Sequence, residues 1–236
     1  MEIKRDEIKE EFLEKPSGLY EIRILTSGGR YNPTLSAYVD ASNLEDVLNQ
    51  IEAYKVPEGS FYNIFLGVNP CREYCRSREQ YGRLISTRNT TQDEDIDRIK
   101  WLVVDIDSPH PTGVSATDDE KHIAFLYACK VVEYMSFNGW SAPETVDSGN
   151  GYHLKWRVDL NNDEGGRELI SDKLEELRAL FPYTDINGQT VYLIDTSVKN
   201  PSRILKTPGS LNMKGRSTEE RPHRWARLME KAEPTE

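Results

Sequence analysis

The 236-residue sequence has few cysteines, no long apolar run and no excess of positive charge, and each shortage excludes a class of protein. Three cysteines are an odd number and too few for a disulfide framework, which indicates a reducing cytoplasm. Cys71 and Cys75 have a spacing that suits a metal, but the further ligands of a zinc site are not found at readable spacing. No apolar run approaches the roughly 20 residues of a membrane-spanning helix, and the charged start MEIKRDEIKEEF is unlike a signal peptide.

The net charge of −10 argues against a protein that binds nucleic acid without specificity. The charge is unevenly distributed, however. Between residues 196 and 230, eight basic residues face three acidic ones, and the basic ones are Lys199, Arg203, Lys206, Lys214, Arg216, Arg221, Arg224 and Arg227. This segment is either a solvated basic tail or an anion-binding surface, and composition leaves both interpretations open.

The apolar periodicity predicts an α+β chain with two modules. Residues 1–100 form an N-terminal α/β module with helices over the first fifteen residues and over 44–54, and strands at 19–25, 34–39 and 60–68. Residues 101–225 follow the order β-α-β-β-α-β, with strands at 101–107, 143–147, 152–158 and 191–195 and helices at 117–137 and 167–181. This order is that of the ferredoxin-like fold of RNA-recognition sheets, in which the first strand lies between the third and fourth. Residues 226–236 are expected to be a tail or linker.

Two aspartates end the first strand of the second module. Asp105 and Asp107 are two residues apart, so they project from one face of the strand while Val104 and Ile106 face the core. Parallel carboxylates repel each other unless a cation lies between them, and Mg²⁺ or Mn²⁺ prefers oxygen ligands. On this pair alone, two solvated aspartates at a turn are the favoured interpretation, because aspartate is common in turns.

A glycine-rich turn precedes the strand at 152–158. The sequence Ser148-Gly149-Asn150-Gly151 allows backbone N–H groups to approach an anion. Beyond it His153, Lys155 and Arg157 share one face, and three potential cations beside such a turn suit a triphosphate. The alternative is a hairpin with a wet basic face.

A third acidic residue ends the last predicted strand. Asp195 is followed by the basic residues Arg203 and Lys206, which are able to pair with phosphates. By itself this segment carries little information. Together the three motifs fall on the first, third and fourth strands of one predicted sheet, which supplies metal ligands and cations for phosphoryl transfer.

The three motifs together resemble the archaeo-eukaryotic primase superfamily, and most closely the primase-polymerases of phages, plasmids and related mobile elements. Asp105-Ile106-Asp107 resembles the first motif of the family, Ser148-Gly149-Asn150-Gly151-Tyr152-His153 the second, and Asp195 with residues 200–206 the third. The resemblance covers residues 101–225. One departure is Gly151, because many relatives have a serine two residues before the histidine.

The resemblance implies a template-dependent nucleotidyltransferase, a DNA primase or polymerase that joins nucleoside triphosphates. It implies that Asp105, Asp107 and Asp195 are catalytic and bind two divalent ions, Mg²⁺ or Mn²⁺. The nucleotide would be bound by Ser148, Asn150, His153, Arg203 and Lys206, and nucleic acid by Lys214, Arg221 and Arg224.

The partners implied are a single-stranded DNA template, a primer strand and nucleoside triphosphates, with a helicase domain or protein as a further partner. The resemblance places the protein in the cytoplasm of a bacterial or archaeal cell, with a phage gene as one possible source. Two alternatives stay open: a catalytically silent nucleic-acid-binding module of a replication initiator, and a repair polymerase of the ligase-associated type.

Overall fold

The structure is a computed structural model that describes residues 1–229. Its first sheet has five antiparallel strands in the order β10-β3-β1-β2-β4. The strands are β1 (Tyr20–Ser27), β2 (Thr34–Val39), β3 (Phe61–Gly67), β4 (Ile85–Ser86) and β10 (Ile204–Lys206). The helices α1 (Arg5–Glu14) and α2 (Leu44–Ala53) supply Ile8, Val47 and Leu48 to the apolar core that this sheet shares with them.

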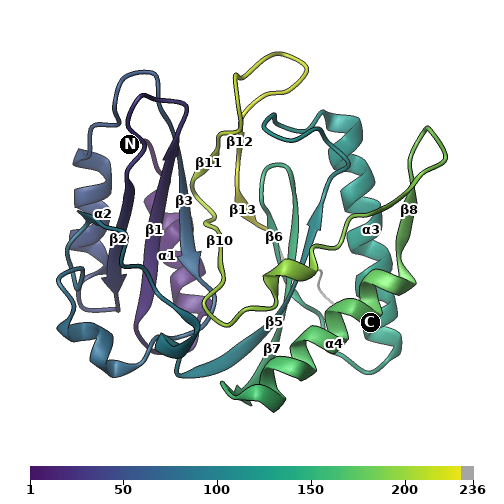
Figure 1. Cartoon of the computed structure of the whole chain (residues 1–236), viewed down its shortest axis with the longest axis horizontal. Helices are drawn as coiled ribbons and strands as arrows, with labels where there is room; N and C mark the ends of the chain where they lie inside the picture. The colour runs from purple at the N-terminus through teal and green to yellow at the C-terminus, as the bar shows by residue number, and fades with distance from the viewer. Residues whose placement is uncertain (230–236) are drawn as a thin grey trace.

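The second sheet has four strands in the order β13-β6-β7-β5, again antiparallel. They are β5 (Arg98–Asp107), β6 (Glu144–Asp147), β7 (Gly151–Asn161) and β13 (Arg227–Leu228). The helices α3 (Asp118–Phe137) and α4 (Glu164–Leu180) cover the face that carries Val104, Ile106, Leu154 and Trp156. In Figure 1 both helices lie on the side of this sheet away from the N-terminal sheet.

The C-terminal part of the chain passes between the two sheets (Figure 1). After α4 come β8 (Pro182–Thr184), β9 (Thr190–Tyr192) and the short 3-10 helix η3 (Thr196–Lys199). The chain then adds β10 to the edge of the first sheet and forms β11 (Leu211–Asn212) with β12 (Arg224–Trp225). The last element of the described residues is β13, on the second sheet. Residues 204–206, which the sequence assigns to the second module, thus complete the first sheet.

Most predicted elements form close to their expected bounds. The polar connection at 71–98 contains two further 3-10 helices, η1 (Glu73–Ser77) and η2 (Asp93–Asp95), beside β4. Helix α3 begins with the expected capping box, because the Thr117 hydroxyl accepts the Glu120 N–H at 3.1 Å and the Glu120 carboxylate accepts the Thr117 N–H at 2.8 Å. No helix within residues 1–229 combines the length and apolarity needed to cross a membrane.

The predicted fourth strand at 191–195 does not form as one element: residues 193–195 lie antiparallel beside β5, but 191 and 192 belong to another hairpin. Residues 190–192 instead form a hairpin with 182–184 around a tight turn, in which the Asp185 carboxylate accepts the N–H groups of Asn187 and Gln189. The Asn187-Gly188 pair, with Gly188 at a φ of 77°, is a hairpin signal that the strand prediction overlooked. Only Ile194 bridges to β5, opposite Ile106.

Candidate active site

Three aspartates from distant parts of the chain meet at one end of β5. Asp105 and Asp107 end the strand, and the segment after β9 runs antiparallel beside it: the Asp107 N–H donates to Leu193 O at 2.8 Å and the Asp195 N–H donates to Asp105 O at 2.9 Å. One oxygen from each carboxylate lies within 4.8 Å of the others. In the part of the chain that the structure describes, this is the one cluster of three acidic, histidine or cysteine side chains close enough to share a metal ion.

The electrostatics of this cluster favour a bound cation. Burial raises the pKa of Asp105 well above its ordinary value, and the negative charges of Asp107 and Asp195 raise it further. Arg203 and Lys214 act in the opposite direction but do not offset the burial. A divalent ion between the carboxylates would remove the repulsion, and the all-oxygen ligand set fits Mg²⁺ or Mn²⁺. Cys71 and Cys75, by contrast, lie buried in an apolar cluster with Leu19 and Ile96.

Asp195 is held in place by the chain that follows it. Its carboxylate accepts the Ser197 N–H at 2.8 Å and the Ser197 hydroxyl at 2.8 Å, so that it caps η3. The sequence motif placed this residue at a strand end. The structure shows a residue fixed from both sides, by the β5 backbone and by η3.

The glycine turn lies against the end of β5. A Cβ at Gly151 would come within 2.2 Å of Ile106 O, which explains why no serine stands at this position. The Ser148 hydroxyl accepts the Gly151 N–H at 3.0 Å, so it stabilises the turn itself. The Asn150 side chain accepts the Ala116 N–H at 3.0 Å through Oδ1, while its buried Nδ2 has no partner within residues 1–229.

His153 lies beside the carboxylates on β7, opposite Asp105 in the strand pairing. Its Nε2 is 3.7 Å from Asp105 Oδ1, and its buried Nδ1 has no partner among residues 1–229. Burial, with a smaller contribution from Lys155, lowers the pKa of His153 to about 3, so the imidazole is neutral at physiological pH. A neutral imidazole still has one N–H to donate to a phosphate oxygen.

The predicted row of three cations on β7 is wrong. Lys155 is buried, and its amine donates to Glu11 at 2.8 Å and pairs with Glu144. The Arg157 guanidinium lies over the Trp101 ring, 4.4 Å from the centroid, and donates to Glu14 O. Only His153 of the three lines the carboxylate pocket.

The two basic residues of the third motif differ in how far their side chains are engaged within the protein. Arg203 lines the pocket and donates to Ser197 O, and its Nε is without a partner in the described chain. Lys206 is buried, and its amine donates to Asn63 Oδ1 at 3.0 Å and to Leu211 O at 2.7 Å. Burial lowers the pKa of Lys206 well below its ordinary value. The amine therefore links Asn63 of β3 to Leu211 of β11 and stabilises the wall of the pocket.

Three pocket residues were not anticipated from the sequence: Asn63, Phe65 and Asn212. Asn63 is the most connected, because its side chain accepts the Met213 N–H at 3.0 Å and donates to Met213 O at 2.8 Å. A single asparagine within a strand pattern carries no sequence signal of such a role. Its function depends on a segment 150 residues away along the chain.

The three residues predicted to bind nucleic acid lie in different environments. Lys214 lines the carboxylate pocket. The Arg221 guanidinium holds both Glu120 oxygens, at 2.7 and 2.9 Å, and also donates to Ser115 O at 2.8 Å. Arg224 donates to Asp118 at 2.6 Å and to Ala116 O at 2.7 Å. Both arginines therefore fasten the β12 region to the start of α3.

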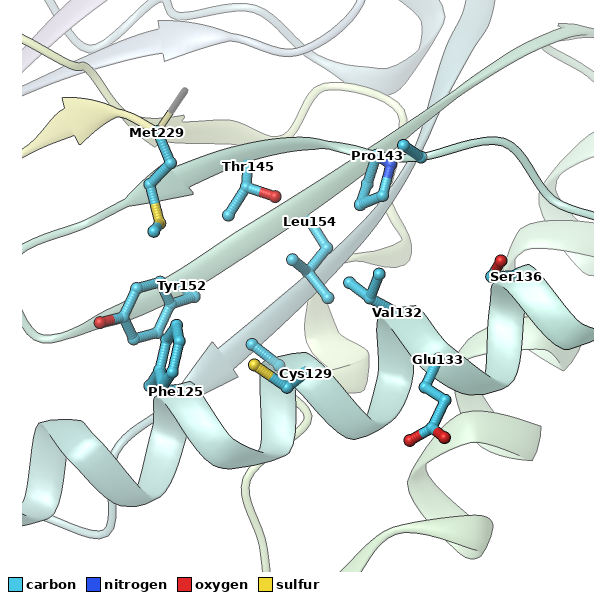
Figure 2. A pocket seen from close by; sticks show the side chains of 12 residues that line it. Phe125, Cys129, Val132, Glu133, Ser136, Pro143, Thr145, Tyr152, Leu154 and Met229 are labelled. Atoms are coloured by element: carbon cyan, nitrogen blue, oxygen red, sulfur yellow. The ribbon is translucent and has the colours of Figure 1, made fainter. Parts of the chain in front are cut away.

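The carboxylate pocket has a volume of about 220 Å³. A larger pocket of about 460 Å³ lies on the opposite face of β7, between α3 and β6 (Figure 2). Its walls are mainly apolar, with Phe125, Val132, Leu154 and Met229 pointing into it. Among the described residues its lining has one carboxylate, Glu133, and no cation, so it suits an apolar group better than a phosphate.

Comparison with known proteins defines the class of fold. No protein-family model matches the chain, and no curated protein is similar to it in sequence. Among solved structures it matches a crystal structure of the primase RepB′ with a TM-score of 0.52 and 13% sequence identity. The match covers 96% of this chain and 56% of that one, so the chain spans little more than half the length of the RepB′ structure. The fold is therefore primase-like.

Proposed function

We propose that the chain is a template-dependent nucleotidyltransferase of the primase-polymerase type, which joins nucleoside triphosphates in the replication of a phage or other mobile element. The observation that carries this proposal is the meeting of Asp105, Asp107 and Asp195 within 4.8 Å in a primase-like fold. A three-carboxylate site beside unpaired nitrogen donors suits phosphoryl transfer.

The proposed arrangement of the second sheet is ferredoxin-like. The order β6-β7-β5 and the bridge from Ile194 to the free side of β5 support it, because they set the first segment between the third and the fourth. In this arrangement β5, β7 and residues 193–195 each bring a polar group to one end of the sheet. The turn before β7 adds Asn150.

In the proposed reaction, the 3′-hydroxyl of a primer or of a first nucleotide attacks the α-phosphate of a nucleoside triphosphate. The new bond joins that oxygen to the α-phosphorus, and the bond from the α-phosphorus to the oxygen that bridges to the β-phosphorus breaks, which releases pyrophosphate. The proton of the hydroxyl passes to water. Two divalent ions, held by Asp105, Asp107 and Asp195, would acidify the attacking hydroxyl and neutralise the triphosphate when bound.

The remaining residues bind and orient the nucleotide in this proposal. Asn150 Nδ2, the His153 imidazole and the Arg203 guanidinium offer donors to phosphate oxygens without first breaking an ion pair. Lys214 adds a positive charge that already acts on Asp105. Lys206 and Ser148 are already hydrogen-bonded within the protein. In this proposal Lys206 stabilises the pocket wall and Ser148 stabilises the glycine turn.

The test is incubation of the protein with a single-stranded DNA template, labelled ribo- or deoxyribonucleotides and Mg²⁺ or Mn²⁺, with and without a primer. Asp105→Ala and Asp107→Ala should each reduce incorporation by about 100-fold or more, because they remove metal ligands. Asp119→Asn, an exposed carboxylate on α3, is the matched control and should retain activity. Normal extension by either alanine variant would refute the assignment. Metal-independent DNA binding with no incorporation by the wild type would instead indicate a silent binding module.

A further inference from the structure

One face of β3 leads from the carboxylate pocket to the tip of the β1–β2 hairpin. Phe61, Asn63 and Phe65 share this face because they are two residues apart. Asn63 and Phe65 line the pocket. At the other end the Phe61 ring meets His223 edge-on, with 5.7 Å between centroids, and a Cβ on Gly28 would lie 2.9 Å from the Phe61 ring. The hairpin tip and the β11–β12 loop therefore meet at Phe61.

The hairpin tip and this loop present an aromatic ring and cations that are not used within the protein. Tyr31 is 66% exposed, and Arg30 and Arg216 are exposed as well. Within residues 1–229 none of these three side chains has a hydrogen-bond, ion-pair or ring partner. The turn that carries Arg30 and Tyr31 is itself held firmly, since Asn32 Oδ1 accepts the Gly29 N–H at 3.0 Å and Asn32 Nδ2 donates to Gly29 O at 3.1 Å.

The β11–β12 loop is anchored on residues 113–120, before and at the start of α3. His223 Nε2 lies 2.8 Å from Gly215 O, and a Cβ at Gly215 would come within 2.5 Å of Gly113 O. Together with the ion pairs of Arg221 and Arg224, these interactions fix the base of the loop and leave Arg216 free. Figure 1 shows the loop, in yellow, at the end of the molecule to which the β1–β2 hairpin also points.

We propose that the β1–β2 hairpin tip and the β11–β12 loop bind single-stranded nucleic acid as it enters the carboxylate pocket, with Tyr31 stacking on a base and Arg30 and Arg216 contacting phosphates. The inference rests on the proposed nucleotidyltransferase function, for which this strand is the template. Aromatic rings stack on bases of any sequence, and neighbouring cations follow the backbone. A duplex is the poorer ligand, because its bases already stack on one another and offer the ring no free face.

The experiment measures binding of a fluorescently labelled 20-nucleotide DNA by anisotropy, as a single strand and as a duplex, with EDTA present to separate binding from catalysis. Tyr31→Ala should weaken binding of the single strand by about tenfold, while Tyr31→Phe should retain it. The double variant Arg30→Ala/Arg216→Ala should also bind the single strand more weakly. The negative slope of the logarithm of the association constant against the logarithm of the salt concentration should become shallower by about 0.7 for each phosphate that the variant no longer neutralises. Arg83→Ala is the control, since this exposed arginine lies beside β4 at the opposite edge of the first sheet.

Thermal unfolding and nucleotide binding of each variant, which should match those of the wild type, verify that the fold and the pocket are intact. Wild-type single-strand affinity in Tyr31→Ala, equal losses in Tyr31→Ala and Tyr31→Phe, or a wild type that binds no single strand would overturn the proposal. If the wild type incorporates no nucleotide but the variants lose single-strand binding, the binding surface stands and the nucleotidyltransferase proposal fails. If the wild type extends primers and the variants bind the single strand normally, the nucleotidyltransferase proposal stands and the binding surface is refuted.

Discussion

The amine of Lys206 illustrates how the chemistry of a residue depends on its partners. From the sequence this lysine was expected to contact phosphates, because it follows Asp195 in a basic segment. In the structure it is buried and donates to Asn63 Oδ1 and Leu211 O. Asn63 in turn holds both backbone groups of Met213, the residue before Lys214. Lys206 is thus a positioning residue for the part of the chain that brings Lys214 into the pocket.

Replacing Lys206 should therefore change nucleotide binding through the pocket wall. In Lys206→Met the Leu211 carbonyl loses its donor, and we expect the KM for the nucleotide to rise by about tenfold, the equivalent of one lost hydrogen bond. kcat should fall less, because the carboxylates are not displaced. Steady-state kinetics would measure both quantities. Lys199→Met, which changes an exposed lysine of η3, is the control, and an unchanged KM in Lys206→Met would contradict this role.

At this scale, the sequence predicted the position of those side chains whose placement depends on spacing within a strand or turn. Asp105 and Asp107 follow from strand alternation, and His153 from its place after a glycine turn. Lys155 and Asn63 were misjudged or missed because their partners, Glu11 and Met213, lie 144 and 150 residues away in sequence. No local pattern encodes such partners.

At the scale of elements, a buried ion cluster links α1 to the second sheet. Lys155 of β7 pairs with Glu11 of α1 and with Glu144 of β6, and Lys15 lies 3.5 Å from Glu11. Burial alone would raise the pKa of Glu11, but the charges of Lys155 and Lys15 outweigh it and lower the pKa. The cluster therefore fixes the helix against the face of the sheet that carries the active site.

Removing one member of this cluster should destabilise the protein. Glu11→Gln leaves Lys15 without its closest anion and Lys155 with Glu144 alone, and we expect the free energy of unfolding to fall by about 3 kcal/mol. Urea unfolding monitored by circular dichroism would measure the loss. Glu10→Gln, on the exposed side of the same helix, should change stability by less than about 0.5 kcal/mol. Equal stability of the two variants would contradict the importance of the cluster.

The same cluster predicts a pH dependence. Burial lowers the pKa of Lys15 from 10.5 to about 8. Between pH 8 and 10.5 the unfolded chain therefore binds more protons at this residue than the folded chain, and its contribution to stability rises with pH. In Lys15→Met this contribution is absent, so the stability of the wild type relative to the variant should increase across that window. Urea unfolding at several pH values would measure it, and a relative decrease would contradict the assignment.

The prediction of elements succeeded where one strong local signal was present and failed where two signals competed. The capping box at Thr117 and the apolar stripe of α4 fixed both long helices near their observed bounds. For residues 191–195 the sequence predicts one strand, the fourth of the second module. The Asn187-Gly188 turn instead pairs 190–192 with 182–184 and leaves Ile194 to contact β5.

At the scale of the whole molecule, the two sheets are joined by chain segments that cross between them. β10 pairs with β3 although it comes more than 130 residues later, and Ile3 bridges to Ser210. The mixed α+β class was predictable from periodicity. That β10 joins the first sheet was not predictable from the sequence, because a strand of three residues has no distinctive pattern of its own.

A fragment of residues 1–100 should accordingly fail to fold alone. It lacks β10, which leaves the edge of β3 unpaired, and it lacks Lys155, which pairs with Glu11 in the full chain. We expect no cooperative thermal transition in the fragment, whereas the full chain should show one. Circular dichroism during heating would compare the two. A sharp transition together with a dispersed amide spectrum in the fragment would show that the N-terminal module is independent.

We propose that three carboxylates, from β5 and from the segment after β9, hold divalent metal, and titration with Mn²⁺ by isothermal calorimetry tests this most directly. The wild type and the Asp119→Asn control should bind Mn²⁺ saturably. Asp195→Asn should lose at least about tenfold in affinity, since even the outer shell of a metal site contributes that much. Wild-type Mn²⁺ affinity in Asp195→Asn would contradict the account.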